Sequence, residues 1–261
     1  MEIVSAMALR ALEKHNYGEL SIYQDLLSGI YNTHIPPYGE QIFQREYFRM
    51  IRDPGWFASL LVSDADIEGY SAGRLWTYAS TVPDTHFAKE IQRHALDEAR
   101  HSKLFSRMVL RLFPSLDEKD LREKLDAMSP ELPPDTPEAS EESRRGSFEE
   151  ILNSAILLNI YEVKALVMLE LLRPALLAYC EPSDQSWGKR VMSVLVADEA
   201  RHIGYTARFI NAAAANGYRS YISDAMEDFQ RALNDVSWLE LEDTITEFDE
   251  TSEEFEALIK R

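Results

Sequence analysis

Two identical pentapeptides hold the residues of this chain best suited to metal chemistry. Asp-Glu-Ala-Arg-His occurs at 97–101 and again, letter for letter, at 198–202. A glutamate and a histidine three positions apart lie on the same face of a helix, where a carboxylate oxygen and an imidazole nitrogen can reach one metal ion. Each copy therefore predicts half of a metal site, Glu98 with His101 and Glu199 with His202.

Each half-site needs a further inward-facing carboxylate from a neighbouring helix. Glu68 and Glu98 stand at similar distances on either side of a turn at Pro83-Asp84, so a helical hairpin brings them to the same height. Later in the chain, Glu162 and Glu170 both interrupt an otherwise apolar helical segment. Glu162 is the preferred ligand and Glu170 the alternative, because Glu170 lies one turn from Pro174, where the backbone is harder to predict.

Four buried carboxylates and two imidazoles would carry a large uncompensated charge, which two divalent cations would remove. An oxygen-rich donor set with open positions suits iron or manganese better than a closed structural zinc site. Asp97 and Asp198 are natural acceptors for the other N–H of the ligand imidazoles, with Arg100 and Arg201 to balance their charge. His94, one turn before Glu98, is either an additional ligand or a hydrogen-bond partner of that carboxylate.

These residues require long helices to position them, and the sequence predicts an almost entirely helical fold. Glycine is scarce, with 10 residues, and apolar residues recur at spacings of three and four. Asp84 is a suitable N-cap for the second long helix, and Pro182-Ser183-Asp184 for the fourth. Two antiparallel hairpins joined by an exposed connection at 129–147 are expected. Long helices are predicted at 56–80, 85–113, 148–179 and 185–215, two or three shorter ones at 3–52, and one or two at 218–258.

The amino-acid composition limits the classes of partner and the cellular compartment that are expected for this protein. Asp and Glu number 45 against 27 Lys and Arg, a net charge of −18, whereas nucleic-acid-binding proteins usually carry a basic surface. The single cysteine, Cys180, can form neither an internal disulfide nor a cysteine-based metal site. The N-terminus lacks a signal-peptide pattern, and polar residues interrupt the apolar segment 151–179. A cytoplasmic protein without a nucleic-acid or membrane partner is expected.

The doubled motif, together with Glu68 and Glu162, resembles the ferritin-like di-iron carboxylate proteins. The resemblance covers about residues 56–215 and implies one ferritin-like four-helix domain across 1–261, with additional N- and C-terminal helices. It implies a centre of two iron ions, with manganese or a mixed manganese–iron pair as alternatives. The implied ligands, which are also the catalytic residues, are Glu68, Glu98, His101, Glu162, Glu199 and His202, with His94 as an additional candidate.

The sequence motif Asp-Glu-x-Arg-His is similar to that of the oxygen-activating branch of this group. That branch includes monooxygenase hydroxylase subunits, acyl-carrier-protein desaturases and di-iron arylamine N-oxygenases. The resemblance implies an oxygenase or oxidase that uses O2, an external electron donor such as a reductase or ferredoxin, and a small organic substrate. N-oxygenation of an amine is the leading reaction, followed by hydroxylation or desaturation of a carbon centre.

Single positions separate the members of this branch. Phe105 stands where ribonucleotide reductase small subunits carry a radical tyrosine, and Leu166 where monooxygenases often carry a threonine. The N-oxygenases have an extra histidine four residues before a motif glutamate, and His94, Glu98 and His101 have this spacing. In that family the extra histidine precedes the second motif, where this chain has Leu195, so the correspondence holds only by pseudo-symmetry.

Three other functions compete with this interpretation. A ferroxidase or iron-storage protein is the main alternative, although the chain is longer than a minimal ferritin subunit needs. A rubrerythrin-like protein would need a cysteine-ligated iron domain, which one cysteine cannot form. A tRNA-modifying di-iron hydroxylase is disfavoured by the negative charge. The additional helices suggest a homodimer.

Overall fold

A computed structural model describes residues 3–116, 119–133 and 147–259, and every regular element in these ranges is helical. The prediction of an all-α protein is therefore confirmed. The elements are α1 (Ile3–Lys14), α2 (Ser21–Thr33), η1 (Pro37–Gly39), α3 (Gln41–Met50), α4 (Pro54–Ala79), α5 (Thr85–Leu112), η2 (Pro114–Leu116), α6 (Lys119–Met128), α7 (Phe148–Tyr179), α8 (Gln185–Ala213), η3 (Ala214–Tyr218, a π-helical turn) and α9 (Arg219–Ile259).

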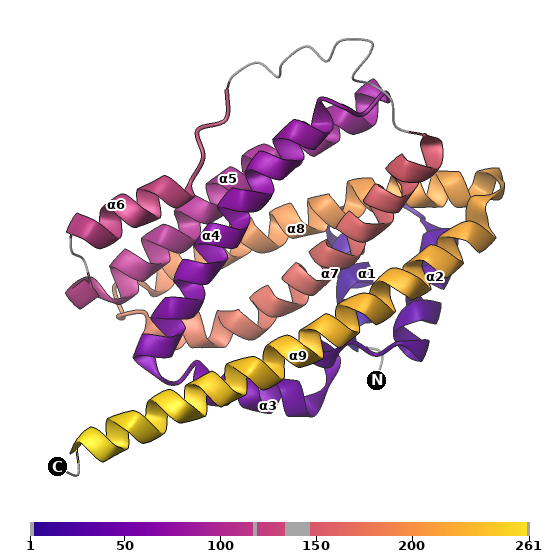
Figure 1. Cartoon of the computed structure of the whole chain (residues 1–261). Coiled ribbons are helices and arrows are strands. Elements are labelled where there is room, and N and C mark those ends of the chain that lie inside the picture. The colour runs from indigo at the N-terminus through magenta and orange to yellow at the C-terminus, as the bar shows by residue number, and fades with distance from the viewer. Residues whose placement is uncertain (1–2, 117–118, 134–146, 260–261) are drawn as a thin grey trace.

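Four long helices form the bundle that holds the candidate site. α4 packs along α5 and α7 along α8, and α5 also contacts α8, so the two predicted hairpins lie against each other (Figure 1). The connection between the hairpins was predicted at 129–147. Of this segment, residues 134–146 lie outside the described residues.

Local capping fixes where three of the long helices begin. Asp53 accepts a hydrogen bond from the backbone N–H of Trp56 at the start of α4, and Ser147 forms a capping box with Glu150 at the start of α7. Asp84 accepts from two backbone N–H groups at the start of α5, as predicted. The predicted side-chain cap of α8 is wrong, because the Asp184 carboxylate makes no capping bond and instead binds Arg111.

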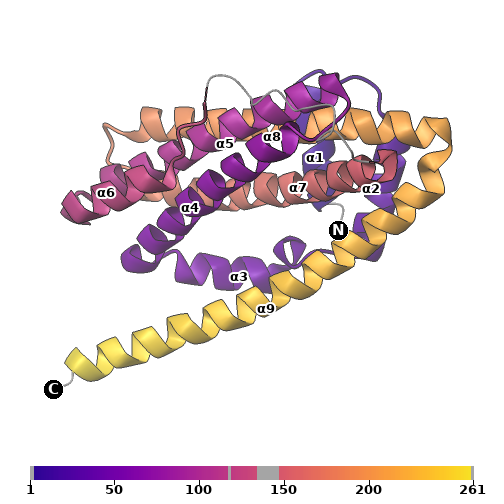
Figure 2. The same ribbon diagram turned by 45° about the horizontal axis from the view of Figure 1, so that its top comes forward.

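The remaining helices cover the bundle. α1 contacts α7 and α8, while α9 crosses α7 and then extends beyond the bundle (Figures 1 and 2). The sequence predicted one or two helices after Gly217. The described residues there form one helix, α9, and Gly217 in the turn before it has a positive φ of 99°. α6 was not predicted, and its Leu125 is buried against α4 and α5.

None of the described helices combines the length and the apolar character that crossing a membrane requires. α7 is the most apolar of the long helices, and it continues unbroken through Pro174. Its apolar side chains, including Leu166 and Leu172, are buried in the core of the bundle.

Candidate metal centre

All six ligands predicted from the sequence lie in the interior of the four-helix bundle. α5 and α8 supply one motif copy each, because residues three or four apart stay on the same helix face. α4 and α7 each add one carboxylate from their middle turns, at the same height as the motifs. His94, Glu98, His101, Glu162, Glu199 and His202 are buried, and Glu68 is partly buried.

The potential ligands form two adjacent groups that could each hold a metal ion. Within each group, one ligand atom from every residue lies within 4.8 Å of the others. The two groups differ in their number of imidazoles, because the first contains both His94 and His202 and the second contains only His101. The first comprises His94, Glu98, Glu162 and His202, and the second Glu68, His101 and Glu199.

Two carboxylates connect the groups. Glu98 places one oxygen 3.2 Å from Nδ1 of His202 and the other 3.5 Å from Nδ1 of His101. Glu199 does the same, with one oxygen 3.5 Å from His101 Nδ1 and the other 3.5 Å from His202 Nδ1. Each of these glutamates can therefore bridge two ions, whereas the sequence motif alone assigned each to its own half-site.

Two further carboxylates lie at the ends of the cluster. An oxygen of Glu162 lies 3.3 Å from His202 Nδ1, and an oxygen of Glu68 lies 3.8 Å from His101 Nδ1. Glu170, the alternative third-helix ligand, belongs to neither group and pairs with Arg173 at 2.7 Å. The geometry therefore agrees with the choice of Glu162.

His94 joins the cluster through Nε2, which lies 2.8 Å from Glu98 and 3.3 Å from Glu162. Its ring stacks on that of His202, with 3.6 Å between ring centroids. Its other nitrogen, Nδ1, forms a hydrogen bond of 2.9 Å with the hydroxyl of Tyr205. His94 can thus serve as a seventh ligand whose orientation Tyr205 fixes. Sequence reasoning missed this bond, although Tyr205 follows His202 by three positions on the same face of α8.

The aspartates of the two motifs orient the histidines crosswise. Nε2 of His101 lies 3.2 Å from Asp198, and Nε2 of His202 lies 3.5 Å from Asp97, so each aspartate serves the histidine of the other motif. Their predicted role as acceptors fits this geometry, which leaves Nδ1 of each imidazole free to face the carboxylates. Arg100 forms hydrogen bonds to both aspartates, at 2.7 Å and 2.6 Å, and Arg201 pairs with Asp97.

The buried carboxylates have opposite pKa shifts. Burial raises the pKa of Glu68 well above its usual value, and the negative charge of Glu98 raises it further. The pKa of Glu199 is raised by burial and by Glu162 and Glu98. Burial also opposes ionisation of Glu98 and Glu162, but hydrogen bonds and nearby histidines outweigh it and lower both pKa values. In the metal-free protein, Glu68 and Glu199 therefore keep a proton to higher pH than an ordinary glutamate does.

The imidazoles are also perturbed. Burial lowers the pKa of His94, but Tyr205 and Glu162 raise it well above its usual value. Burial lowers the pKa of His101 too, and Glu98 and Asp198 reverse that effect. Burial and the positive charge of His94 together lower the pKa of His202 to about 4. His94 and His101 therefore keep their protons to higher pH than an ordinary histidine does, and these protons partly balance the negative charge of the carboxylates.

One further observation supports the fit of this cluster to a pair of divalent metal ions. Four of its potential ligand atoms are buried and, although His94 Nε2 and Glu98 Oε1 lie 2.8 Å apart, none of the four forms a hydrogen bond of good geometry. A buried polar atom without a partner is costly, and metal coordination satisfies such an atom. These atoms are His94 Nε2, Glu98 Oε1, His101 Nδ1 and Glu199 Oε2.

Comparison with known proteins gave no match to a family model, to a curated protein or to a solved structure. The interpretation of the cluster therefore depends on its own geometry and chemistry. These are sufficient for one conclusion, namely that the buried histidines and glutamates could hold a metal ion.

Proposed function

We propose that this chain is a ferritin-like di-iron protein that uses O2 to oxidise a small organic substrate. The observation that supports the proposal best is the pair of glutamates, Glu98 and Glu199, that each face both ligand groups. Bridging carboxylates suit two ions held side by side, and seven donors leave coordination positions open for reactants. Manganese, or a mixed manganese–iron pair, is the alternative metal content, because nitrogen and oxygen donors serve both ions.

When bound, the metal pair would supply the redox chemistry with O2. The side chains of this protein do the remaining work. Asp97 and Asp198 fix the tautomer and orientation of His202 and His101, so that the ligand nitrogens are in place before a metal binds. The surrounding bundle excludes water, which would otherwise quench a reactive oxidant.

N-oxygenation of an amine is the reaction that we favour within this class. The resemblance to di-iron N-oxygenases depends on an extra histidine, and His94 directs Nε2 into the first ligand group. Hydroxylation or desaturation of a carbon centre is the second choice. An external reductase or ferredoxin would deliver electrons, because a single cysteine cannot ligate an iron–sulfur cluster within the chain.

The test begins with anaerobic loading of the protein with Fe(II), followed by metal analysis. We expect two irons per chain in the wild type and in Glu170→Gln, which alters a glutamate outside the cluster, and fewer in Glu98→Ala. The loaded protein is then exposed to O2 with a reductant and a panel of amines, and products are analysed by mass spectrometry.

A product that is heavier by one oxygen atom, and that Glu98→Ala does not form, would support the proposal. Two irons in Glu98→Ala would contradict the metal centre. Uptake of many irons per chain, with no oxidised organic product, would instead identify an iron-handling protein.

A further inference from the structure

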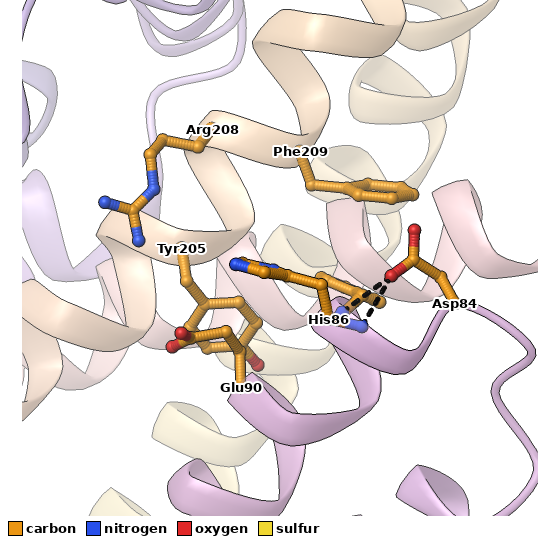
Figure 3. A pocket seen from close by; sticks show the side chains of 7 residues that line it. Asp84, His86, Glu90, Tyr205, Arg208 and Phe209 are labelled. Atoms are coloured by element: carbon orange, nitrogen blue, oxygen red, sulfur yellow. Dashed lines mark hydrogen bonds between the residues drawn. The ribbon is translucent and has the colours of Figure 1, made fainter.

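A second feature of the molecule is a pocket between the first turns of α5 and the last turns of α8 (Figure 3). Its volume is about 490 Å³, within the range of small-molecule sites. α5 contributes Phe87 and Glu90 among other residues, and α8 contributes Tyr205, Arg208 and Phe209.

The pocket lies on the same seam between α5 and α8 as the metal cluster. Along α5, Glu90, His94 and Glu98 follow one another at intervals of one turn, so the pocket begins about 6 Å along the helix axis from His94. Tyr205 separates the two sites. It lines the pocket, is 3% exposed and forms a 2.9 Å hydrogen bond with His94.

The carboxylates of the pocket already have partners, and one of its cations does not. Asp84 accepts hydrogen bonds from two backbone N–H groups of α5, and Glu90 lies 3.9 Å from the guanidinium of Arg201. Arg208 lies over the Tyr17 ring at 5.0 Å and pairs with no carboxylate among the described residues. Arg208 is therefore a guanidinium that lines the pocket without a carboxylate partner among the described residues, and its planar donors match a carboxylate.

Aromatic rings form another wall of the pocket. Phe87 and Phe209 stack with their centroids 4.3 Å apart, and Phe87 also contacts Tyr205 at 5.7 Å. Such a wall binds an apolar group through its faces and edges.

We propose that this pocket binds a small organic acid that carries an aromatic or branched apolar group. Its carboxylate pairs with Arg208, its apolar body packs against Phe87 and Phe209, and its far end lies at Tyr205, on the side of the metal cluster. This assigns the substrate of the oxygenase to the organic acids, which for N-oxygenation means an acid that also carries an amine. Only that assignment rests on the proposed function. Binding itself requires no metal.

The experiment titrates metal-free protein with phenylacetate by isothermal calorimetry, and with phenethylamine as a probe of similar shape and opposite charge. Phenylacetate should bind, and Arg208→Gln should weaken its binding about tenfold or more, because the pair is charge-assisted. Arg208→Lys should retain part of the affinity. Arg190→Gln, an exposed residue about 27 Å away along α8, should bind phenylacetate like the wild type. Arg208 is exposed, so its replacement should leave the thermal melting unchanged.

No binding of phenylacetate, equal binding by Arg208→Gln, or tighter binding of phenethylamine would overturn the proposal. The link to the metal cluster is measured separately by the visible absorption of protein loaded with Co(II). Phenylacetate should change that spectrum in the wild type and change it less in Tyr205→Phe, and an equal change in both would exclude Tyr205 as the link. If the protein binds phenylacetate but not Co(II), the proposed ligand of the pocket is supported and the proposed function is refuted.

Discussion

At the scale of single residues, the feature with the widest consequences is that Glu98 and Glu199 each face both ligand histidines. A carboxylate in this position could contact both ions of a bound pair, whereas Glu68 and Glu162 lie at opposite ends of the cluster. Removing a shared carboxylate and removing a terminal one should therefore differ in outcome.

We expect Glu98→Ala and Glu199→Ala to lose most of the affinity for both metal equivalents, and Glu68→Ala to lose one equivalent only. In Glu68→Ala the first group keeps all four of its ligands. Titration with Co(II), followed by visible absorption, measures the stoichiometry. Glu170→Ala is the control, and loss of one equivalent in all three cluster variants would argue against bridging.

Asp198 should affect metal binding without contacting the metal. Asp198→Asn weakens the acceptor of the His101 N–H, and we expect metal affinity to fall about 10–100-fold, as for other partners of metal ligands. Asp184→Asn is the matched control, because Asp184 binds Arg111 far from the cluster. Equal affinities in the two variants would show that the hydrogen bond to His101 has no orienting role.

The pKa shifts predict that metal affinity rises with pH. The raised pKa values of Glu68, Glu199, His94 and His101 mean that the metal-free cluster keeps protons to higher pH than ordinary side chains do, and these protons must leave before the side chains can ligate. Co(II) should therefore bind more tightly at pH 8 than at pH 6 and release protons, which an indicator dye in weak buffer detects. Binding without proton release would contradict these protonation states.

The spacing within the pentapeptides was sufficient to identify the candidate ligands on α5 and α8, because Glu-x-x-His fixes which side chains share a helix face. It could not show that Asp97 serves His202 and Asp198 serves His101, since this exchange depends on how α5 and α8 are aligned. The same alignment brings Tyr205 to His94. Contacts between helices have no local sequence signal of their own.

At the scale of helices, α2 supports the hairpin that carries half of the ligands. The buried Asn159 of α7 accepts a hydrogen bond of 2.9 Å from the Tyr23 hydroxyl and donates one of 2.9 Å to Thr206. Asn159 precedes Glu162 by one turn, and Thr206 follows His202 by one turn. This network therefore holds α2, α7 and α8 in register beside the candidate metal ligands.

Asn159→Leu should destabilise the protein by about 1–3 kcal/mol, because it leaves the buried Tyr23 and Thr206 hydroxyls short of partners. Tyr23→Phe removes one bond and should cost about 1 kcal/mol. Urea unfolding followed by circular dichroism measures both. Ser193→Ala, on the exposed face of α8, should change little. A smaller effect of Asn159→Leu than of Tyr23→Phe would contradict this account.

Helix positions were predictable where a local signal marks an end. Asp84 and the segment after Pro182 placed two helix starts correctly, and α7 has the predicted bounds. α6 was not predicted, and a single helix after Gly217 was one of two alternatives that the sequence left open, because both depend on packing against distant helices. The role of Asp184 was wrong for the same reason, since Arg111 belongs to the other hairpin.

At the scale of the whole molecule, the metal-free fold encloses a cluster of buried histidines and glutamates. Ions that bind only the folded state stabilise it, by about 2.7 kcal/mol for a site at a free concentration 100 times its dissociation constant. We expect Co(II) or anaerobic Fe(II) to raise the melting temperature by several degrees, and a chelator to reverse the shift. Glu98→Ala should show little of this gain, and an equal shift in that variant would indicate that the ions bind elsewhere.

The crosswise pairing of Asp97 with His202, and of Asp198 with His101, also bears on how such a protein could arise. Neither half of the bundle is self-sufficient, because each contributes an imidazole that only the opposite half can orient. An isolated hairpin with one pentapeptide would meet the same requirement by associating with a second copy of itself. The repeated letters at 97–101 and 198–202 are what the fusion of two such copies would leave in one polypeptide.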